Sequence, residues 1–265
     1  MRHAPEVERE LGKPLEQPLW HCGACGHLQV HPIPSPERIA SYYPSNPNAR
    51  TPRKGVGWAG GKIQPPPSYL RRLEWVEAKR SGKLLDVGFG TGSFLRAAHR
   101  KGYRVAGLDL NTAQFKPEFE CEVREGLLRV GLFPDESFDV IAAHHVLEHV
   151  QDFPESLHVI HALLKPGGYL LVELPHDRGS LIKGLKRAVL RRGYTKFTRL
   201  QHLRFFTVQS LRVALSRVGF HIELCRSVPS HELLQFPKSL ALTPLAPFER
   251  WTGRGHNLEA IARKP

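Results

Sequence analysis

Three glycines at alternate positions, Gly88, Gly90 and Gly92, follow the acidic residue Asp86, and a second acidic residue, Asp109, stands about 20 residues further on. Glycine has no Cβ, so its backbone adopts conformations that other residues avoid and can lie directly against a ligand. A carboxylate at the end of the next strand can accept both hydroxyls of a ribose. These residue types at this spacing predict a nucleoside site.

The spacing of the glycines distinguishes between classes of nucleoside. A dinucleotide-binding turn has the pattern G-x-G-x-x-G, but Ser93 occupies its third glycine position here, and the chain has no G-x-x-x-x-G-K-[ST] phosphate loop. The D-x-G-x-G-x-G pattern instead resembles the first motif of Rossmann-like methyltransferases that depend on S-adenosylmethionine. The alternative for the turn alone is a strand–turn–helix joint with incidental glycines.

Three later segments occur in the order found in one group of these methyltransferases: FDV at 138–140, LEHV at 147–150 and LKPGG at 164–168. Because several ordered segments are much harder to obtain by chance than one, the chain is identified as a member of this family. The resemblance covers about Leu84 to Phe220. It implies an α/β fold, a doubly wound, mostly parallel seven-stranded sheet with an antiparallel last strand and helices on both faces, and S-adenosyl-L-methionine as cofactor.

The elements that must position these residues are visible as apolar runs. Short runs predict strands at 84–87, 104–108, 121–123, 138–141, 169–174, 220–224 and 257–263, and amphipathic spacing predicts helices at 68–80, after 93 and at 154–165. In such sheets ligands bind outside the carboxyl ends of the strands. The resemblance implies the following cofactor-binding residues there: Asp86, Gly88, Phe89, Gly90 and Gly92 along the methionyl group and ribose, Asp109 on the ribose, Leu110, Gly126 and Leu127 around the adenine, and His144 beneath the methionyl group.

Histidines are the candidates for the catalytic base that a hydroxyl acceptor requires, because imidazole titrates near neutral pH. His202 is the preferred candidate, since its segment resembles an "HLxFFT" segment of relatives that act on sugars and glycans. His176 follows the fifth strand, and His145 follows the fourth. The alternative is that His202 only packs or forms local hydrogen bonds.

A metal site is conceivable at two places. His145, Glu148 and His149 resemble an E-x-x-E-H segment that binds magnesium in quinone-type O-methyltransferases, but a histidine replaces the first carboxylate and magnesium prefers oxygen ligands. The favoured alternative is that His149 packs the turn while Glu148 faces solvent, so no metal is assigned.

The second place is the C-x-x-C segment of Cys22 and Cys25, which resembles one half of a two-knuckle zinc leader found in a subgroup that includes sugar C-methyltransferases. A structural zinc requires four ligands. The open alternatives are that one of three nearby histidines completes a site, or that the knuckle is vestigial and is packed by Trp20 and Leu28. These histidines are His21, His27 and His31.

Composition predicts the domain organisation and the kind of partner. Residues 1–66 are rich in proline and glycine and are expected to form an irregular extension, followed by a methyltransferase domain over 67–265. The formal net charge is +13, and a predicted basic helical insertion at about 178–204 contains nine basic and no acidic residues. Such a helix suits an anionic membrane surface or a phosphate-bearing acceptor, such as a nucleotide-linked or lipid-linked sugar, or it only aids solubility.

Nucleic acid is not favoured as a partner, because the Asn/Asp-Pro-Pro-aromatic element that stacks a flipped base is missing after the fourth strand. The leading hypothesis is methyl transfer to a hydroxyl or carbon of a small metabolite, a sugar or glycan precursor. The alternatives are a quinone or phenol O-methyltransferase and a non-catalytic cofactor-binding protein. The sequence has four cysteines with no framework of pairs, and it has no secretory or membrane-spanning run, so we expect a cytoplasmic protein. The basic helix would allow peripheral contact with the inner membrane face.

Overall fold

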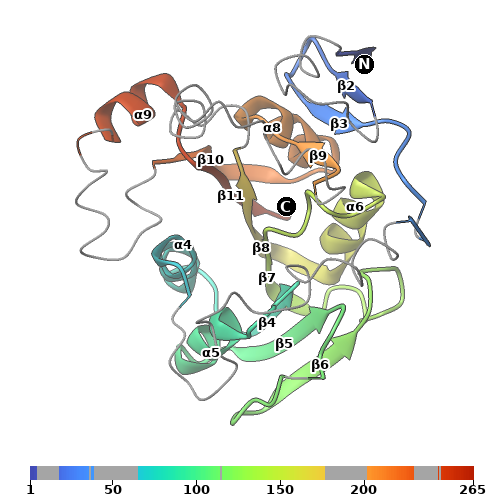
Figure 1. The fold of residues 1–265 in the computed structure, drawn as a ribbon. Coiled ribbons are helices and arrows are strands. Elements are labelled where there is room, and N and C mark those ends of the chain that lie inside the picture. The colour runs from blue at the N-terminus through green and yellow to red at the C-terminus, as the bar shows by residue number, and fades with distance from the viewer. Residues whose placement is uncertain are drawn as a thin grey trace.

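A seven-stranded sheet forms the centre of the computed structural model, which describes residues 1–4, 18–35, 37–38, 65–113, 115–176, 202–229, 244 and 246–265 (Figure 1). The strand order is β10-β11-β8-β7-β4-β5-β6. The strands from β8 to β6 are parallel, whereas β11 is antiparallel to both of its neighbours, β8 and β10. The predicted α/β fold class is therefore confirmed. The strands are β4 (Lys83–Val87), β5 (Arg104–Asp109), β6 (Cys121–Glu125), β7 (Phe138–His144), β8 (Leu164–Pro175), β10 (His221–Val228) and β11 (Asn257–Arg263).

Helices cover both faces of this sheet. Two of them pack in one hydrophobic cluster with side chains from one face of the sheet: α4 (Pro67–Glu77) and α5 (Ser93–Arg100). Two others share the cluster on the opposite face: α6 (Phe153–Leu163) and α8 (Val208–Arg217). Strand β7 is buried along its whole length, as expected for a central parallel strand covered on both sides.

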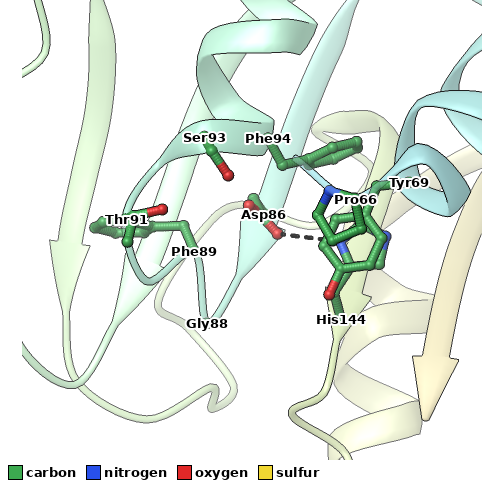
Figure 2. Close-up of a pocket in the computed structure, with 9 residues that line it drawn as sticks. All are labelled: Pro66, Tyr69, Asp86, Gly88, Phe89, Thr91, Ser93, Phe94 and His144. Carbon is green, nitrogen blue, oxygen red and sulfur yellow. Dashed lines mark ion pairs between the residues drawn. The ribbon is translucent and has the colours of Figure 1, made fainter. Parts of the chain in front are cut away.

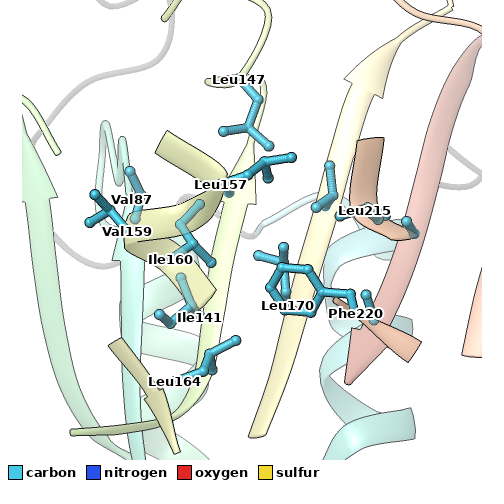
Figure 3. Packing of buried hydrophobic residues seen from close by; sticks show 14 of the residues in the cluster. Val87, Ile141, Leu147, Leu157, Val159, Ile160, Leu164, Leu170, Leu215 and Phe220 are labelled. Carbon is cyan, nitrogen blue, oxygen red and sulfur yellow. The ribbon is translucent and has the colours of Figure 1, made fainter. Parts of the chain in front are cut away.

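The larger cluster shows how the two helices meet the sheet (Figure 3). Leu157 and Ile160 of α6 share this cluster with Ile141 of β7, and Leu215 of α8 shares it with Leu170 of β8. These side chains are almost fully buried, and burying each one stabilises the fold by about 1.5–3 kcal/mol relative to exposure. This packing fixes β7 and β8, whose carboxyl ends carry the histidines of interest.

The helix predicted at 154–165 ends before its expected last residues, and β8 begins at Leu164. The helix ends at Leu163, because Pro166 disfavours a helical conformation for the residue before it. The chain then continues directly as strand, and its first part is held by the end of the chain: Gly167 N donates to Lys264 O and Lys264 N donates to Gly168 O. This pairing depends on residues about a hundred positions away, which a local pattern does not reveal.

A second, four-stranded sheet includes part of the segment that was expected to be irregular. It contains β1 (Arg2–His3), β2 (Leu19–His21), β3 (Leu28–Val30) and β9 (Arg204–Phe205) in that order. In Figure 1 these N-terminal strands lie beside β9 and α8. A final helix, α9 (Ala246–Thr252), precedes β11.

The predicted basic insertion lies outside the described residues, apart from its last three positions, 202–204. In the part of the chain that the structure describes, no helix combines the length and apolar character needed to cross a membrane.

Candidate functional site

A cavity of about 340 Å³ opens at the carboxyl ends of β4 and β7 (Figure 2). It lies where ligands bind in open α/β sheets, between two strands that continue into loops. Four of the predicted cofactor-binding residues line it together: Asp86, Gly88, Phe89 and His144. The other lining residues are Pro66, Tyr69, Thr91, Ser93 and Phe94.

The turn after β4 needs its glycines for different reasons. All three have positive φ, a conformation that other residues rarely adopt. A Cβ on Gly92 would come within 2.1 Å of Phe115, and a Cβ on Gly88 within 2.3 Å of Val146, so these two glycines allow close packing. A Cβ on Gly90 would meet nothing within 4 Å. The open space beside Gly90 is where a ligand can approach the bare main chain.

Asp109 ends β5 and is oriented toward this turn. Its Oδ2 accepts a hydrogen bond from Gly90 N at 2.8 Å, and its Oδ1 accepts one from Asn111 N at 3.2 Å. The carboxylate is therefore fixed beside the open face of Gly90.

The predicted adenine-binding residues lie at the ends of β5 and β6. Leu110 and Leu127 are exposed to 57% and 61%, respectively, and neither lines the described cavity. Gly126 N donates to the carbonyl of Asp109 at 2.9 Å, so the two loops are tied together.

The deep end of the cavity contains a buried carboxylate. Asp86 is only 3% exposed, and burial together with the negative charge of Asp109 raises its pKa well above the usual range. The nearest ring, that of His144, places Nδ1 4.0 Å from Asp86 Oδ1 (Figure 2). Burial lowers the pKa of His144 well below its usual range, so this imidazole is neutral and gives Asp86 no counter-charge. A cationic ligand such as S-adenosylmethionine fits this site, because a positive charge nearby favours the ionised form of Asp86 that burial disfavours.

Two aromatic residues of the cavity were not predicted as site residues. Tyr69, on the first turn of α4, stacks on His144, and the ring of Phe94 meets the same imidazole edge to face. In the sequence, Tyr69 was visible only as part of the apolar face of a helix. The structure shows that this face reaches over the carboxyl end of β7.

A buried ion network holds α4 against the sheet. Arg72 Nη1 lies 2.8 Å from Glu173 of β8 and 2.7 Å from Glu259 of β11. Burial by itself would raise the pKa of Glu173, but the guanidinium of Arg72 and the imidazole of His145 together outweigh burial and lower it. Asn257 donates a further hydrogen bond of 2.8 Å to the same carboxylate. Glu173 is therefore ionised and firmly positioned.

His145 follows β7 in a left-handed conformation, with φ of 56°. Its Nδ1 lies 3.6 Å from Glu148 Oε1, and its Nε2 lies 3.4 Å from Glu173 Oε1. Burial by itself would lower the pKa of this histidine, but the two carboxylates outweigh burial and raise it to about 9. An imidazole that is protonated at neutral pH does not suit the role of general base suggested for His145.

Glu148 lies at the centre of a second cluster. The expectation that Glu148 faces solvent is wrong, because its side chain is only 1% exposed. One ligand atom each from Glu148, His149 and His202 lies within 4.8 Å of the other two. The loop that contains Glu148 also includes Val146, the residue that packs against Gly88 of the cofactor turn.

Backbone contacts bring His202 to this loop. Leu203 N donates to Glu148 O at 2.9 Å, and the guanidinium of Arg204 donates to the carbonyls of Val150 and Gln151. The rings of His149 and His202 then lie edge to face, with centroids 4.9 Å apart. His202, the preferred candidate for the catalytic base, therefore lies next to Glu148 and His149 of the segment that was considered for a metal site.

His176 lies apart from this cluster. Its Nδ1 lies 3.1 Å from the carbonyl of Gly255, and its ring is buried against the segment before β11. It does not line the described cavity.

Cys22 and Cys25 lie at the tip of the β2–β3 hairpin, which is closed by hydrogen bonds between Cys22 and His27 and between Gly26 and Cys22. Among the described residues, the cluster around Glu148 is the only group of three or more potential metal ligands. The cysteine pair therefore has no third ligand there, and the zinc alternative gains no support.

Comparisons with known proteins agree with the geometry. The model of a family described as "Methyltransferase domain" matches residues 64–224, more than half of the chain. The demethylmenaquinone methyltransferase of Chlorobaculum parvum is 34% identical over 98 residues, which cover 35% of this chain and 41% of that protein. The ubiquinone biosynthesis O-methyltransferase of Alkalilimnicola ehrlichii is 31% identical over 113 residues, which cover 38% of this chain and 46% of that protein. The chain spans about half the length of these curated relatives.

A solved structure extends the fold comparison over most of the chain. The 1,6-didemethyltoxoflavin-N1-methyltransferase of Burkholderia thailandensis, with S-adenosylhomocysteine bound, is similar with a TM-score of 0.60 and 19% identity over 92% of this chain and 97% of that chain. At this identity the likeness shows the fold. With the match to the family over residues 64–224, it establishes that the chain belongs to the methyltransferase-domain family and has a class I domain that uses S-adenosylmethionine.

Proposed function

We propose that this domain transfers a methyl group from S-adenosylmethionine to a hydroxyl on an aromatic ring of the quinol or phenol type. Both curated relatives have names that concern quinones, and neither name concerns a sugar. The quinone alternative therefore replaces the sugar or glycan precursor as the favoured acceptor. An anionic or membrane-bound acceptor has no support from the described residues.

The observation that carries the proposal is the aromatic wall of the cavity. Tyr69 and Phe94 both contact the ring of His144, which has no hydrogen bond to either ring nitrogen among the described residues. These rings offer apolar, flat surfaces. Flat surfaces of this kind suit an aromatic acceptor, since offset-stacked and edge-to-face arrangements add about 0.5–1.5 kcal/mol to simple burial.

Cofactor binding follows from the geometry of the turn. Asp109 would accept the ribose hydroxyls beside the open main chain of Gly90, and the buried carboxylate of Asp86 would face the positively charged methionyl end. The sulfonium supplies the activated methyl group. The protein has to hold donor and acceptor in line at near-attack distance. The loops after β4 and β7 leave adjacent parallel strands and would do so together.

The acceptor hydroxyl must also lose a proton. His145 is already protonated at neutral pH, and His176 lies against another segment. His202 therefore stays the preferred proton acceptor, and the buried carboxylate of Glu148 lies beside it. A carboxylate next to an imidazole stabilises the imidazolium that forms on proton transfer.

The proposal is tested with purified protein and S-adenosylmethionine carrying a labelled methyl group. Three acceptors are compared: a catechol with a short prenyl chain, a reduced demethylnaphthoquinone with an unsubstituted ring carbon, and a nucleotide-linked sugar. We expect label on an oxygen of the catechol and none on the sugar, by mass spectrometry of the products. Label on the sugar alone, or on the ring carbon alone, would contradict the proposal.

A further inference from the structure

We propose that Glu148, His149 and His202 form a binding site for a divalent transition-metal ion of the zinc type. One carboxylate and two imidazoles are the ligand set of catalytic zinc sites, in which the fourth position stays open for water or substrate. Their ligand atoms already lie within 4.8 Å of one another.

The distances are compatible with such a site after small side-chain rotations. Ligand atoms about 2.1 Å from a tetrahedral ion lie about 3.4 Å from one another. Glu148 Oε1 and His149 Nε2 are 3.6 Å apart, so this pair is already close to that spacing. The third ligand, His202, comes from a segment whose backbone is hydrogen bonded to the loop of Glu148. The site is therefore assembled by backbone contacts.

The burial of Glu148 is an independent indication of a ligand. Its carboxylate is almost completely buried, yet neither of its oxygens has a hydrogen bond among the described residues. Burying a charged group is costly unless it is paired or coordinates a metal. The imidazoles of His145 and His149 lie within ion-pair distance of Oε1, at 3.6 Å, but too far away for a hydrogen bond. A metal ion between Glu148, His149 and His202 would satisfy the carboxylate.

This site differs in its ligands and its ion from the magnesium segment considered above. His145 is not part of it, because its two ring nitrogens face Glu148 and Glu173. His202 takes its place as a ligand from a distant part of the chain. Two nitrogen ligands favour zinc or cobalt over magnesium, which prefers an octahedron of oxygens.

An open coordination position would give the site a role in catalysis, and this role rests on the proposed function. A ring hydroxyl bound to the ion would be acidified, because a bound divalent metal lowers the pKa of an oxygen ligand. With the ion bound, His202 would be a ligand instead of the proton acceptor proposed above, and the acidified hydroxyl would release its proton to water. Metal binding itself is independent of the acceptor and can be tested without it.

The test uses the full chain after treatment with a chelator, titrated separately with Zn²⁺ and Mg²⁺ in a calorimeter. We expect one tightly bound Zn²⁺ per chain and no comparable binding of Mg²⁺. Cobalt at the same site should give the visible absorption of a four-coordinate ion. His202→Ala and Glu148→Gln should each weaken Zn²⁺ binding by about 100-fold or more, since even residues behind the ligands contribute about 10–100-fold.

Two control variants assign the ion to this site. His158→Ala removes an exposed histidine of α6 and should leave zinc binding unchanged. The double variant Cys22→Ser, Cys25→Ser removes the competing thiols and should also retain one Zn²⁺. Retained binding of S-adenosylhomocysteine and an unchanged circular dichroism spectrum show that each variant is folded. If His202→Ala does not fold, His149→Gln is used in its place, because the side chain of His149 is 29% exposed.

Zinc binding that is lost in the cysteine variant but kept in Glu148→Gln would overturn the proposal, as would stronger binding of Mg²⁺ or no binding of either ion. Zinc binding at this site without methylation of the catechol would contradict only the proposed function.

Discussion

The ring of Tyr69 lies parallel to the ring of His144, with centroids 3.7 Å apart and planes only 9° apart (Figure 2). This stack joins the first turn of α4 to the carboxyl end of β7. Because both residues line the cavity, the helix before the sheet forms a wall of the proposed site, which the cofactor and the acceptor would share.

Removing this wall should weaken cofactor binding. We expect Tyr69→Ala to lower the affinity for S-adenosylhomocysteine by about 10-fold, because an aromatic contact is worth about 0.5–1.5 kcal/mol beyond its burial. Tyr69→Phe keeps the ring and should bind almost as well as the wild type. Calorimetric titration of both variants checks this, and equal affinity of Tyr69→Ala and wild type would refute the role of the stack.

A comparison of Gly90 with Gly102 separates the effect of backbone strain on stability from the effect of a lost ligand contact on binding. Both have positive φ, and a Cβ on either would meet nothing within 4 Å. Gly90→Ala and Gly102→Ala should each lower the free energy of unfolding by about 1–2 kcal/mol, through backbone strain alone. Only Gly90→Ala should weaken binding of S-adenosylhomocysteine, by about 10-fold or more, because its new methyl group occupies the ligand's side of the turn. Equal loss of binding in both variants would contradict this role of Gly90.

Arg72 and its neighbour Arg71 both approach Glu259 but differ in burial. Arg72 is buried and pairs with two carboxylates, whereas the side chain of Arg71 is 39% exposed. Arg72→Met should lower the free energy of unfolding by about 3–5 kcal/mol, because two buried carboxylates lose the buried cation that they share. Arg71→Met should lower it by less than about 1 kcal/mol. Urea unfolding of both variants measures the difference, and a similar loss in both would show that the buried network does not anchor α4.

His27 predicts a dependence of stability on pH. Burial, aided by the charge of Arg204, lowers its pKa from 6.5 to about 4 in the folded protein. The unfolded chain therefore takes up a proton as the pH falls below 6.5, while the folded chain does not until about pH 4. Stability from this group is complete above pH 6.5 and decreases as the pH falls toward 4.

Between pH 7.5 and pH 5 we expect His27 to contribute a loss of about 2 kcal/mol in the free energy of unfolding. The measurement is urea unfolding of wild type and His27→Gln at both pH values. The variant should lose about 2 kcal/mol less than the wild type over this interval, and an identical loss in both proteins would contradict the assignment.

The cofactor half of the site was predictable because its residues belong to short, continuous segments. The strand, the glycine turn and the helix after it follow one another without interruption, and Asp109 ends the adjacent strand. Parallel pairing of β4 and β5 then brings Asp109 to Gly90 by geometry alone. The cofactor contacts themselves stay predictions.

The histidine cluster was not predictable in the same way. Glu148 was expected to face solvent, because nothing in its own segment shows that Leu203 and Arg204 bind the loop through backbone and side-chain hydrogen bonds. The raised pKa of His145 likewise depends on Glu173, which comes from another strand. The N-terminal strands contain only two or three residues each, too few for a periodic pattern to be seen.

Binding of S-adenosylhomocysteine to wild type and to Asp109→Ala, measured side by side in a calorimeter, tests the central claim most directly. We predict one ligand per wild-type chain and an affinity about 100-fold lower in the variant, since hydrogen bonds to a charged group contribute about 1.5–3 kcal/mol each. Glu118→Gln, at an exposed carboxylate, should bind like the wild type. No heat with the wild type, or equal affinity in wild type and Asp109→Ala, would contradict the account.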